Sequence, residues 1–260
     1  MEVRKIVSTW RYPEASERQL SRSLSEMVKE LVVFARDQLD GMRFDATTAE
    51  IDDAESSLED YAAVLIAALV ATLPALAFKI YKFNTSEFVK MAKASGGKDN
   101  PVVIMLIALG ATGNENWYMD KSEEWEAIAA ASFRKLANDL IADWSMNVRV
   151  QNSKGASRDL IDEIIEARYK VYTGWTVNRS RGIVATWNSL LMRQRLEDTG
   201  VTHYFWRGKL DERERLKHLR WEAKRLLVDG DHVFPGEEYG CRCWAEPDFS
   251  TTQEVTFNVS

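Results

Sequence analysis

Hydrophobic residues recur at three- and four-residue spacing along most of the chain, which predicts amphipathic helices. Polar residues with helix-capping character mark the expected starts of these helices, at Ser16, Thr47, Ser122 and Ser157. The first two open capping-box sequences that reach Gln19 and Glu50. The first helix should end at Gly41 and the last before Gly200, with Gly174 as a place where the last helix bends or divides.

One apolar run complicates this helical pattern. From Tyr61 to Phe78 no residue is charged, and eighteen such residues just reach the length of a membrane-spanning helix. Seven of them are alanine, and Pro74 interrupts the run. We therefore expect a helix buried in the N-terminal domain and bent or ended near Pro74, with a membrane role as the rival interpretation. The shorter run from Val102 to Ala111 is expected to be core as well.

The pattern changes after Gly200. Thr202 to Trp206 is β-branched and aromatic, which predicts a strand. Leu216 to Leu227 is expected to form a short basic helix, and Cys241 to Ala245 a second strand that Pro247 would end. The expected fold class is therefore mainly α with a small C-terminal α+β domain, in which long helices lead into a small sheet.

The polar break Asn152–Gly155 is the best candidate for a domain boundary. It separates a helical N-terminal domain, residues 1–150, from an α+β domain, residues 151–249. Residues 250–260 are expected to be a C-terminal tail.

Charge is distributed unevenly along the chain. In total, 34 basic and 40 acidic residues give a net charge of −6. Residues 166–225, here called the basic band, hold 14 basic and 7 acidic residues, a net of +7. The segments before and after it carry net charges of −7 and −6. The basic band is either a contact surface for an acidic partner or a solvated helical face.

Chemically capable residues gather in the last quarter of the chain, which holds all three His and both Cys. Cys241, Cys243 and His218, with His232 or Asp211, have the donor types that zinc prefers, but the Cys-x-Cys spacing is unusual for a zinc site. A disulfide between cysteines so close in sequence is disfavoured by its geometry. We therefore expect reduced, buried thiols, and neither a bound metal nor a cofactor.

A metal-dependent nuclease is an alternative that uses the same region. Asp211, His218 and His232 could hold a metal ion and activate water, although no metallonuclease spacing is present. A phosphate-binding glycine-rich loop and a nucleophile elbow are both absent from the sequence. The sequence therefore does not favour an enzyme.

The C-terminal part carries a series of short motifs. They are Gly174 to Arg181, Trp187, Tyr204 to Arg207, Leu210 to His218 with the pattern Asp-x-Arg-x-Arg-x-x-His, Pro235-Gly236, and Gly240 to Pro247 around Cys-Arg-Cys. In order and spacing they resemble the Mu-F-like phage head morphogenesis family over about residues 145–249. The motif positions are Trp206, Asp211, Arg213, Arg215, His218, Pro235, Gly236, Cys241, Arg242, Cys243, Trp244 and Pro247.

The resemblance implies a structural virion protein and no established catalytic activity. Such a protein is a minor head protein present in a few copies, associated with the portal vertex, and involved in head assembly or DNA delivery. The implied partners are the portal protein and other capsid proteins, with packaged DNA as a further, non-specific partner. The protein would be made in the cytoplasm of the host bacterium and end in the phage head, without stable membrane insertion. A membrane-active ejection protein that uses Tyr61 to Phe78 stays open as an alternative.

The motif residues also have a structural interpretation. Asp211 can accept hydrogen bonds from nearby arginines and so join the two strands; the candidate donors are Arg213, Arg215 and Arg242. Three tryptophans can fill a small core, namely Trp206, Trp221 and Trp244. In this interpretation the motif is a scaffold.

The arginines of the basic band are the candidate contacts to a partner. They are Arg179, Arg181, Arg193, Arg195, Arg213, Arg215, Arg220 and Arg225. They could bind DNA phosphates or an acidic portal surface. We expect the protein partner, because the whole chain is acidic and long-range repulsion opposes DNA.

Overall fold

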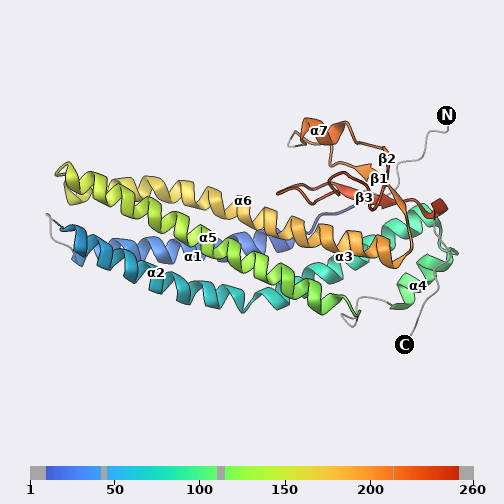
Figure 1. Cartoon of the computed structure of the whole chain (residues 1–260), viewed down its shortest axis with the longest axis horizontal. Helices are drawn as coiled ribbons and strands as arrows, with labels where there is room; N and C mark the ends of the chain where they lie inside the picture. Colours follow the sequence, from blue (N-terminus) through green and yellow to red (C-terminus); the bar gives the residue numbers. More distant parts are fainter. Residues whose placement is uncertain (1–9, 42–45, 110–114, 213, 252–260) are drawn as a thin grey trace. The chain divides into compact units, whose positions relative to one another are not determined.

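The computed structural model describes residues 10–41, 46–109, 115–212 and 214–251. Six helices make up most of these residues: α1 (Glu14–Gly41), α2 (Thr48–Val70), α3 (Leu73–Gly96), α4 (Pro101–Leu109), α5 (Tyr118–Ser153) and α6 (Arg158–Asp198). A small sheet follows, formed by β1 (His203–Arg207), β2 (Arg225–Leu227) and β3 (Trp244–Pro247), with the short helix α7 (Leu216–Leu219) and a 3-10 turn at Phe249–Thr251 (Figure 1). The expected fold class, mainly α with a small C-terminal α+β part, is confirmed.

The sheet is antiparallel, with the strand order β2-β1-β3. In the central strand β1, Tyr204 lies opposite Leu226 of β2, and Trp206 lies opposite Ala245 of β3. Tyr204 and Trp206 are fully buried and their neighbours in β1 are half-buried. This alternation is what a strand with one face on the core requires, and it confirms the strand predicted over residues 202–206.

Two predictions for the C-terminal region are wrong. The helix expected over 216–227 is limited to α7, which ends at Leu219. After Ala223, which has a left-handed backbone (φ 61°), the chain turns back and β2 pairs with β1. The second strand begins at Trp244 rather than at Cys241, so both cysteines precede it. The prediction that Pro247 ends this strand is confirmed.

The contacts between residues divide the chain into two compact units, each built from segments that are distant in sequence. Unit 1 comprises Met1–Ser16, Leu76–Lys121 and Gly182–Ser260, and unit 2 comprises Glu17–Ala75 and Ser122–Arg181. The limits between the units fall inside α1, α3, α5 and α6. Residues 150 and 151, between which the sequence analysis expects a domain boundary, lie inside α5 and within unit 2.

Unit 2 is helical and is held together by apolar faces and ion pairs. Its buried large side chains include Leu24, Leu31, Leu58, Trp125, Phe133 and Trp144. Arg149 of α5 reaches two carboxylates of α2, with Nη2 2.5 Å from Asp52 Oδ1 and 2.9 Å from Glu55 Oε2. These pairs lie partly in solvent, so packing of the apolar faces contributes most of the stability of unit 2.

Unit 1 packs the sheet against helical side chains. Its core cluster includes Phe88 and Met91 of α3, Met192 and Leu196 of α6, and the two buried aromatic residues of β1. Two directed bonds connect α6 to the C-terminal region: Ala245 N donates to Met192 Sδ at 2.9 Å, and Ser189 Oγ donates to Pro235 O at 2.9 Å. The end of α6 therefore forms part of the support of the sheet (Figure 1).

The predicted helix limits are close to those observed. The capping box of α2 is confirmed, with Thr47 N donating to Glu50 Oε2 at 2.7 Å and Glu50 N donating to Thr47 Oγ1 at 3.3 Å. α1 begins at Glu14, slightly before Ser16, and α5 begins at Tyr118, before Ser122. α6 continues through Gly174 without a break and ends at Asp198, before Gly200.

The apolar run from Tyr61 to Phe78 is divided between two helices. α2 ends at Val70 and α3 begins at Leu73, so the break lies just before Pro74, near the expected place. The expectation that the run is buried is only partly correct. Leu69 is buried on the inner face of α2, whereas Val64 is 66% exposed.

The burial of this region is incomplete throughout. By length and composition alone, the stretch Thr48–Gly96 could cross a membrane, and 28% of its apolar eighteen-residue window is buried. The run Val102–Ala111 is also mixed, because Val103 of α4 is buried while Ile104 and Ile107 are exposed; its end, residues 110 and 111, lies outside the described residues.

The capping box gives a test of unit 2. We expect Thr47→Ala to lower the free energy of unfolding by about 1 kcal/mol, because Glu50 N would lose its side-chain acceptor. Urea denaturation followed by circular dichroism measures the change. Thr48→Ala is the matched control, since Thr48 is exposed and alanine favours a helix at that position. Equal stability of the two variants would contradict a stabilising role for the cap.

Candidate metal centre

The two cysteines lie in a non-regular segment that enters β3, and both are buried and free of disulfide bonding. Cys241 is 6% exposed and Cys243 is 3% exposed. The segment before them turns at Gly236, whose φ of 86° favours glycine, and whose Cα faces the side chain of Ser189 of α6. This turn brings the cysteine segment beside α7.

His218 of α7 lies between the two thiols. Its Nδ1 is 3.5 Å from Cys241 Sγ and 3.4 Å from Cys243 Sγ. The ligand atoms of these three residues all lie within 4.8 Å of one another. Thiolate sulfur and imidazole nitrogen are the usual donors to zinc, so these three side chains could hold a metal ion together.

A carboxylate, that of Glu214, lies beside two of these three residues. Glu214 Oε1 is 3.0 Å from Cys243 Sγ and 3.8 Å from His218 Nδ1, and the Glu214 side chain is only 6% exposed. Its other oxygen accepts a hydrogen bond from Leu210 N at 3.1 Å, which fixes the orientation of the carboxylate. We name Glu214, His218, Cys241 and Cys243 the Cys–His–Glu cluster.

The far side of the imidazole is also bonded. His218 Nε2 is 3.0 Å from Glu238 Oε2, and Glu238 also pairs with Arg215 and Lys217. The hydrogen bond from Lys217 is the main reason that the pKa of Glu238 falls to about 2, so this carboxylate is charged at neutral pH. A charged Glu238 can accept a hydrogen bond from Nε2–H, and Nδ1 is the nitrogen that faces the thiols.

The two thiols differ in acidity because they face each other. The hydrogen bond from Cys243 lowers the pKa of Cys241, and the backbone N–H groups of Cys243 and Gly236 act in the same direction. The neighbouring Cys241 sulfur and burial raise the pKa of Cys243.

An ion pair joins the segment after β1 to the cysteine segment. Arg242 Nη2 donates to Asp211 at 2.8 and 2.7 Å, one distance to each carboxylate oxygen. Arg215 bonds to Glu238 and to the backbone oxygen of Tyr239 rather than to Asp211. Arg213 lies outside the described residues.

Aromatic rings surround the cluster. The Trp206 ring is 5.3 Å from the His218 ring and 4.6 Å from the Trp221 ring, both in edge-to-face arrangements. The Trp221 ring stacks on His218 at 5.9 Å. Trp206 and Trp244 belong to the core cluster of unit 1, and Trp221 packs against it. The rings of Trp206 and Trp221 thus lie against the imidazole of His218.

The residues suggested for a nuclease do not converge. Asp211 is engaged by Arg242, and His232 Nε2 lies 2.8 Å from Tyr204 OH. Only His218 of the three belongs to the group of described residues whose ligand atoms lie close together. Of the four weak metal candidates, the structure joins Cys241, Cys243 and His218 and leaves His232 apart.

The sequence analysis did not identify Glu214 or Glu238 as part of this site. A signal for Glu214 was present, since it precedes His218 by four residues and one helical turn places such residues on the same side. Glu238 has no local signal. Its approach to His218 depends on the turn that returns the chain toward α7.

Most arginines of the basic band form ion pairs within their own unit. Arg179 pairs with Asp139, Arg181 with Glu17, Arg193 with Glu197 and Asp229, and Arg225 with Asp248. Arg195 is 3% exposed and bonds to Glu115 and Thr85, so it cannot reach an outside partner. Arg220 is exposed.

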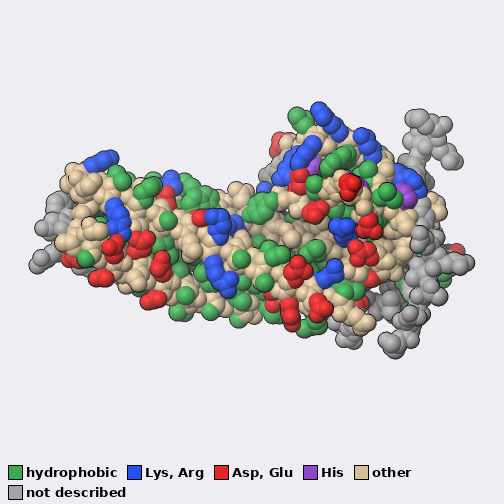
Figure 2. All heavy atoms as spheres, in the orientation of Figure 1, with side chains coloured by type: hydrophobic (Ala, Val, Ile, Leu, Met, Phe, Trp, Pro, Cys, Tyr) green, Lys and Arg blue, Asp and Glu red, His purple; other side chains and the backbone are tan. Residues whose placement is uncertain are grey.

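The exposed positive charge of unit 1 is concentrated near α7. Figure 2 shows Lys and Arg side chains gathered there. The exposed residues of this α7 basic patch are Arg215, Lys217, Arg220 and Lys224. Glu238 partly neutralises the first two, so Arg220 and Lys224 hold most of the available charge.

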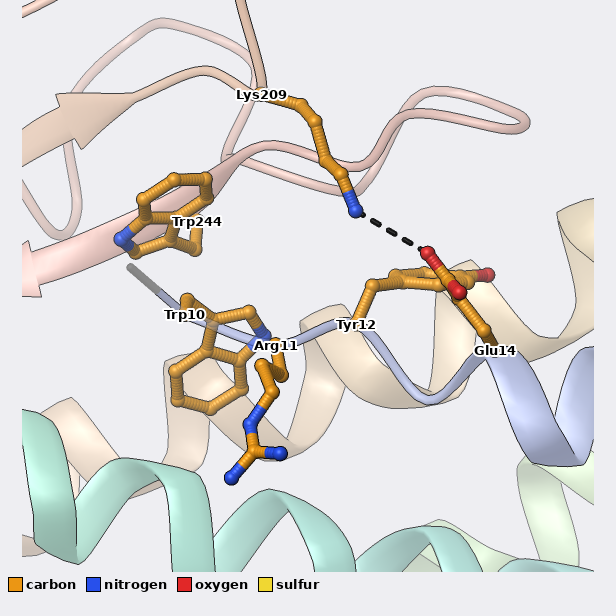
Figure 3. A pocket seen from close by; sticks show the side chains of 6 residues that line it. All are labelled: Trp10, Arg11, Tyr12, Glu14, Lys209 and Trp244. Atoms are coloured by element: carbon orange, nitrogen blue, oxygen red, sulfur yellow. Dashed lines mark hydrogen bonds and ion pairs between the residues drawn. The ribbon is translucent and has the colours of Figure 1, made fainter. Parts of the chain in front are cut away.

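A pocket of about 410 Å³ lies where the N-terminal segment meets the end of the sheet. It is lined by Trp10, Arg11, Tyr12, Glu14, Lys209 and Trp244 (Figure 3). Lys209 Nζ is 3.2 Å from Glu14 Oε1, which ties the N-terminal segment to the loop after β1. The indole rings of Trp10 and Trp244 are buried beside it.

The Asp211–Arg242 pair gives a test of the C-terminal scaffold. We expect Asp211→Ala to lower the free energy of unfolding by about 1–3 kcal/mol, because Arg242 is only 15% exposed and would lose a charged acceptor. Urea denaturation followed by tryptophan fluorescence measures the change. Asp231→Ala, at an exposed carboxylate, is the control and should be neutral. A neutral Asp211→Ala would show that the pair does not stabilise the fold.

Comparison with known proteins gives little further information. No family model matches the chain, and no solved structure matches it. A protein of Haemophilus influenzae strain Rd, described as uncharacterized, is 32% identical over 76 residues. The match covers 27% of this chain and 17% of the relative, so the chain spans only a small part of that protein's length.

Proposed function

We propose that this protein is a structural virion protein of the Mu-F-like kind, a minor head protein associated with the portal vertex. The observation that carries the proposal is that the motif residues contact one another. Asp211 bonds to Arg242, His218 lies against both cysteines, and Trp206 packs edge-on against His218.

These contacts support the resemblance in a specific way. A chance match of short motifs would place its residues without regard to one another in space. Here Trp206 of β1, His218 of α7 and the two cysteines before β3 are all buried and contact one another around His218. The motif thus describes a structural unit, as expected for a family defined by a scaffold.

The same contacts favour a structural role over a nuclease. Asp211 is neutralised by Arg242, and His232 is bonded to Tyr204. Neither group faces the thiols and His218 as a joint metal ligand among the described residues. Head morphogenesis or DNA delivery, with synthesis in the host cytoplasm and a final place in the phage head, is the function that agrees best with a scaffold.

An acidic protein surface, on the portal protein or another capsid protein, is the partner we favour over DNA. The chain carries a net charge of −6, which repels DNA at long range. The internal ion pairs also reduce the positive charge that the basic band offers to phosphates. The α7 basic patch is small, and its chemistry fits a few carboxylates better than a long DNA backbone.

The location is tested on phage particles. Full heads and emptied heads are separated on a density gradient, and peptides of this chain are measured by mass spectrometry. We expect a few copies per full head. Emptied heads that keep the protein indicate an assembly role, and emptied heads that lack it indicate delivery with the DNA. Absence from purified particles would refute the virion assignment.

The partner is tested with charge reversal in the α7 basic patch. We expect Arg220→Glu with Lys224→Glu to weaken capture by the portal protein at least ~10-fold, which corresponds to ~1.4 kcal/mol. Lys98→Glu with Lys154→Glu, two exposed lysines elsewhere, is the matched control and should keep capture. A DNA mobility shift at physiological salt runs beside it. Strong DNA binding without portal capture would assign the partner to packaged DNA instead.

A membrane-active ejection protein is the second candidate, and one observation favours it. The stretch Thr48–Gly96 has the length and apolar composition to cross a membrane, and 28% of its apolar window is buried. Against it, many of the exposed residues are alanine, and the helix is interrupted before Pro74. Alanine contributes little to transfer into lipid compared with leucine or isoleucine.

Liposome sedimentation separates the two candidates. We expect the purified protein to stay in the supernatant with neutral liposomes, without detergent. Val64→Glu should leave this behaviour unchanged, since Val64 is 66% exposed to water. Val150→Glu, on α5, is the control at another exposed valine. The membrane candidate would be favoured if the unaltered protein sedimented with the liposomes and if Val64→Glu, but not Val150→Glu, abolished this sedimentation.

A further inference from the structure

We propose that Glu214, His218, Cys241 and Cys243 form a structural zinc site that cross-links two segments in the C-terminal part of unit 1. The proposal concerns these residues only and is independent of the virion assignment. It replaces the expectation of metal-free thiols, because that expectation rested on the Cys-x-Cys spacing and on the shortage of further cysteines. The fold places three candidate ligands, His218, Cys241 and Cys243, together and adds a fourth, Glu214, that the sequence analysis did not identify.

The first support is the spacing of the ligand atoms. Bonds of ~2.3 Å from zinc to sulfur and ~2.0–2.2 Å to nitrogen or oxygen place neighbouring atoms of a tetrahedron about 3.3–3.8 Å apart. The two separations from His218 Nδ1 to sulfur are 3.5 and 3.4 Å, and the separation from Nδ1 to Glu214 Oε1 is 3.8 Å. Glu214 Oε1 is 3.0 Å from Cys243 Sγ but lies outside the group of ligand atoms that are all within 4.8 Å of one another, so its carboxylate would have to move toward Cys241 to complete the tetrahedron.

The second support is the environment of His218. A histidine that binds a metal through one nitrogen usually donates its other N–H to a carboxylate, which fixes the ring. His218 Nε2 meets Glu238 Oε2 at 3.0 Å, and Lys217 and Arg215 hold Glu238 in place. The other ring nitrogen, Nδ1, is the one that faces both sulfurs and Glu214.

The third support comes from the backbone around Cys241. Cys243 N donates to Cys241 Sγ at 3.5 Å, a bond that orients this sulfur within the cluster. The side chain of His218 is 2% exposed and that of Glu214 is 6% exposed, so a bound ion would be enclosed. Binding would convert both thiols to thiolates and release their protons to solvent.

The coordination indicates a structural rather than a catalytic ion. With Glu214 as the fourth ligand, protein groups would fill the tetrahedron and leave no position for water, whereas catalytic zinc sites keep one open. The ligands come from two segments, 214–218 and 241–243, which the ion would cross-link. Such a link stabilises a region whose three strands have only five, three and four residues.

The direct test is metal content of the whole chain. The protein is expressed with added zinc sulfate, purified without chelator, and analysed by elemental mass spectrometry. We expect about one zinc per chain. Cys243→Ser and His218→Ala should lose it, and Glu238→Gln should weaken zinc binding roughly 10–100-fold. His232→Gln is the matched control and should keep zinc, because His232 bonds to Tyr204 outside the cluster.

A second measurement uses the unaltered protein, so that a misfolded variant cannot obscure the result. Cys241 and Cys243 should resist a thiol reagent until a chelator is added, and then both should react. Cobalt added in place of zinc should give a thiolate charge-transfer band and the visible bands of a tetrahedral ion. A protein without zinc above background, or one that keeps zinc in Cys243→Ser, would overturn the proposal, as would a different metal at one equivalent.

Discussion

Three strands of five, three and four residues cannot enclose a hydrophobic core by themselves, and the arrangement of unit 1 follows from this constraint. Tyr204 and Trp206 point from β1 toward one face, so that face needs a cover. Side chains of α3 and α6 provide it, together with Trp10 from the N-terminal segment. The short sheet therefore depends on segments distant in sequence, and it needs further cross-links where the helices do not reach.

Those cross-links are polar. The Asp211–Arg242 pair and the contacts of His218 with both thiols connect the segment after β1 to the segment before β3. Each would be costly to bury alone, because an unpaired charge or imidazole in a closed site loses its hydration. Together they satisfy one another, and the rings of Trp206 and Trp221 lie against the imidazole of His218. A zinc ion at this point would convert a set of weak polar contacts into one strong link.

Charge pairing within the units also bears on function. Arg195 lies inside the core of unit 1, where Glu115, Thr85 and two aromatic rings surround its guanidinium. Other arginines of the basic band are paired with nearby carboxylates. The excess of +7 in that band therefore overstates the charge available to a partner, and the exposed remainder concentrates near α7. A protein that contacts one acidic surface through a small patch agrees with this distribution.

The sequence by itself determined the helices and the central strand, because their signals are local. Periodic apolar positions and the Thr47–Glu50 box define α2, and the aromatic run defines β1. Other features depended on distant partners. β2 exists because β1 lies beside it, so Leu226 pairs with Tyr204 instead of continuing a helix. Glu238 becomes a site residue only when the chain returns past α7. The tertiary structure alone decided which charges are buried and paired, because burial and pairing depend on neighbours in space that no local pattern specifies.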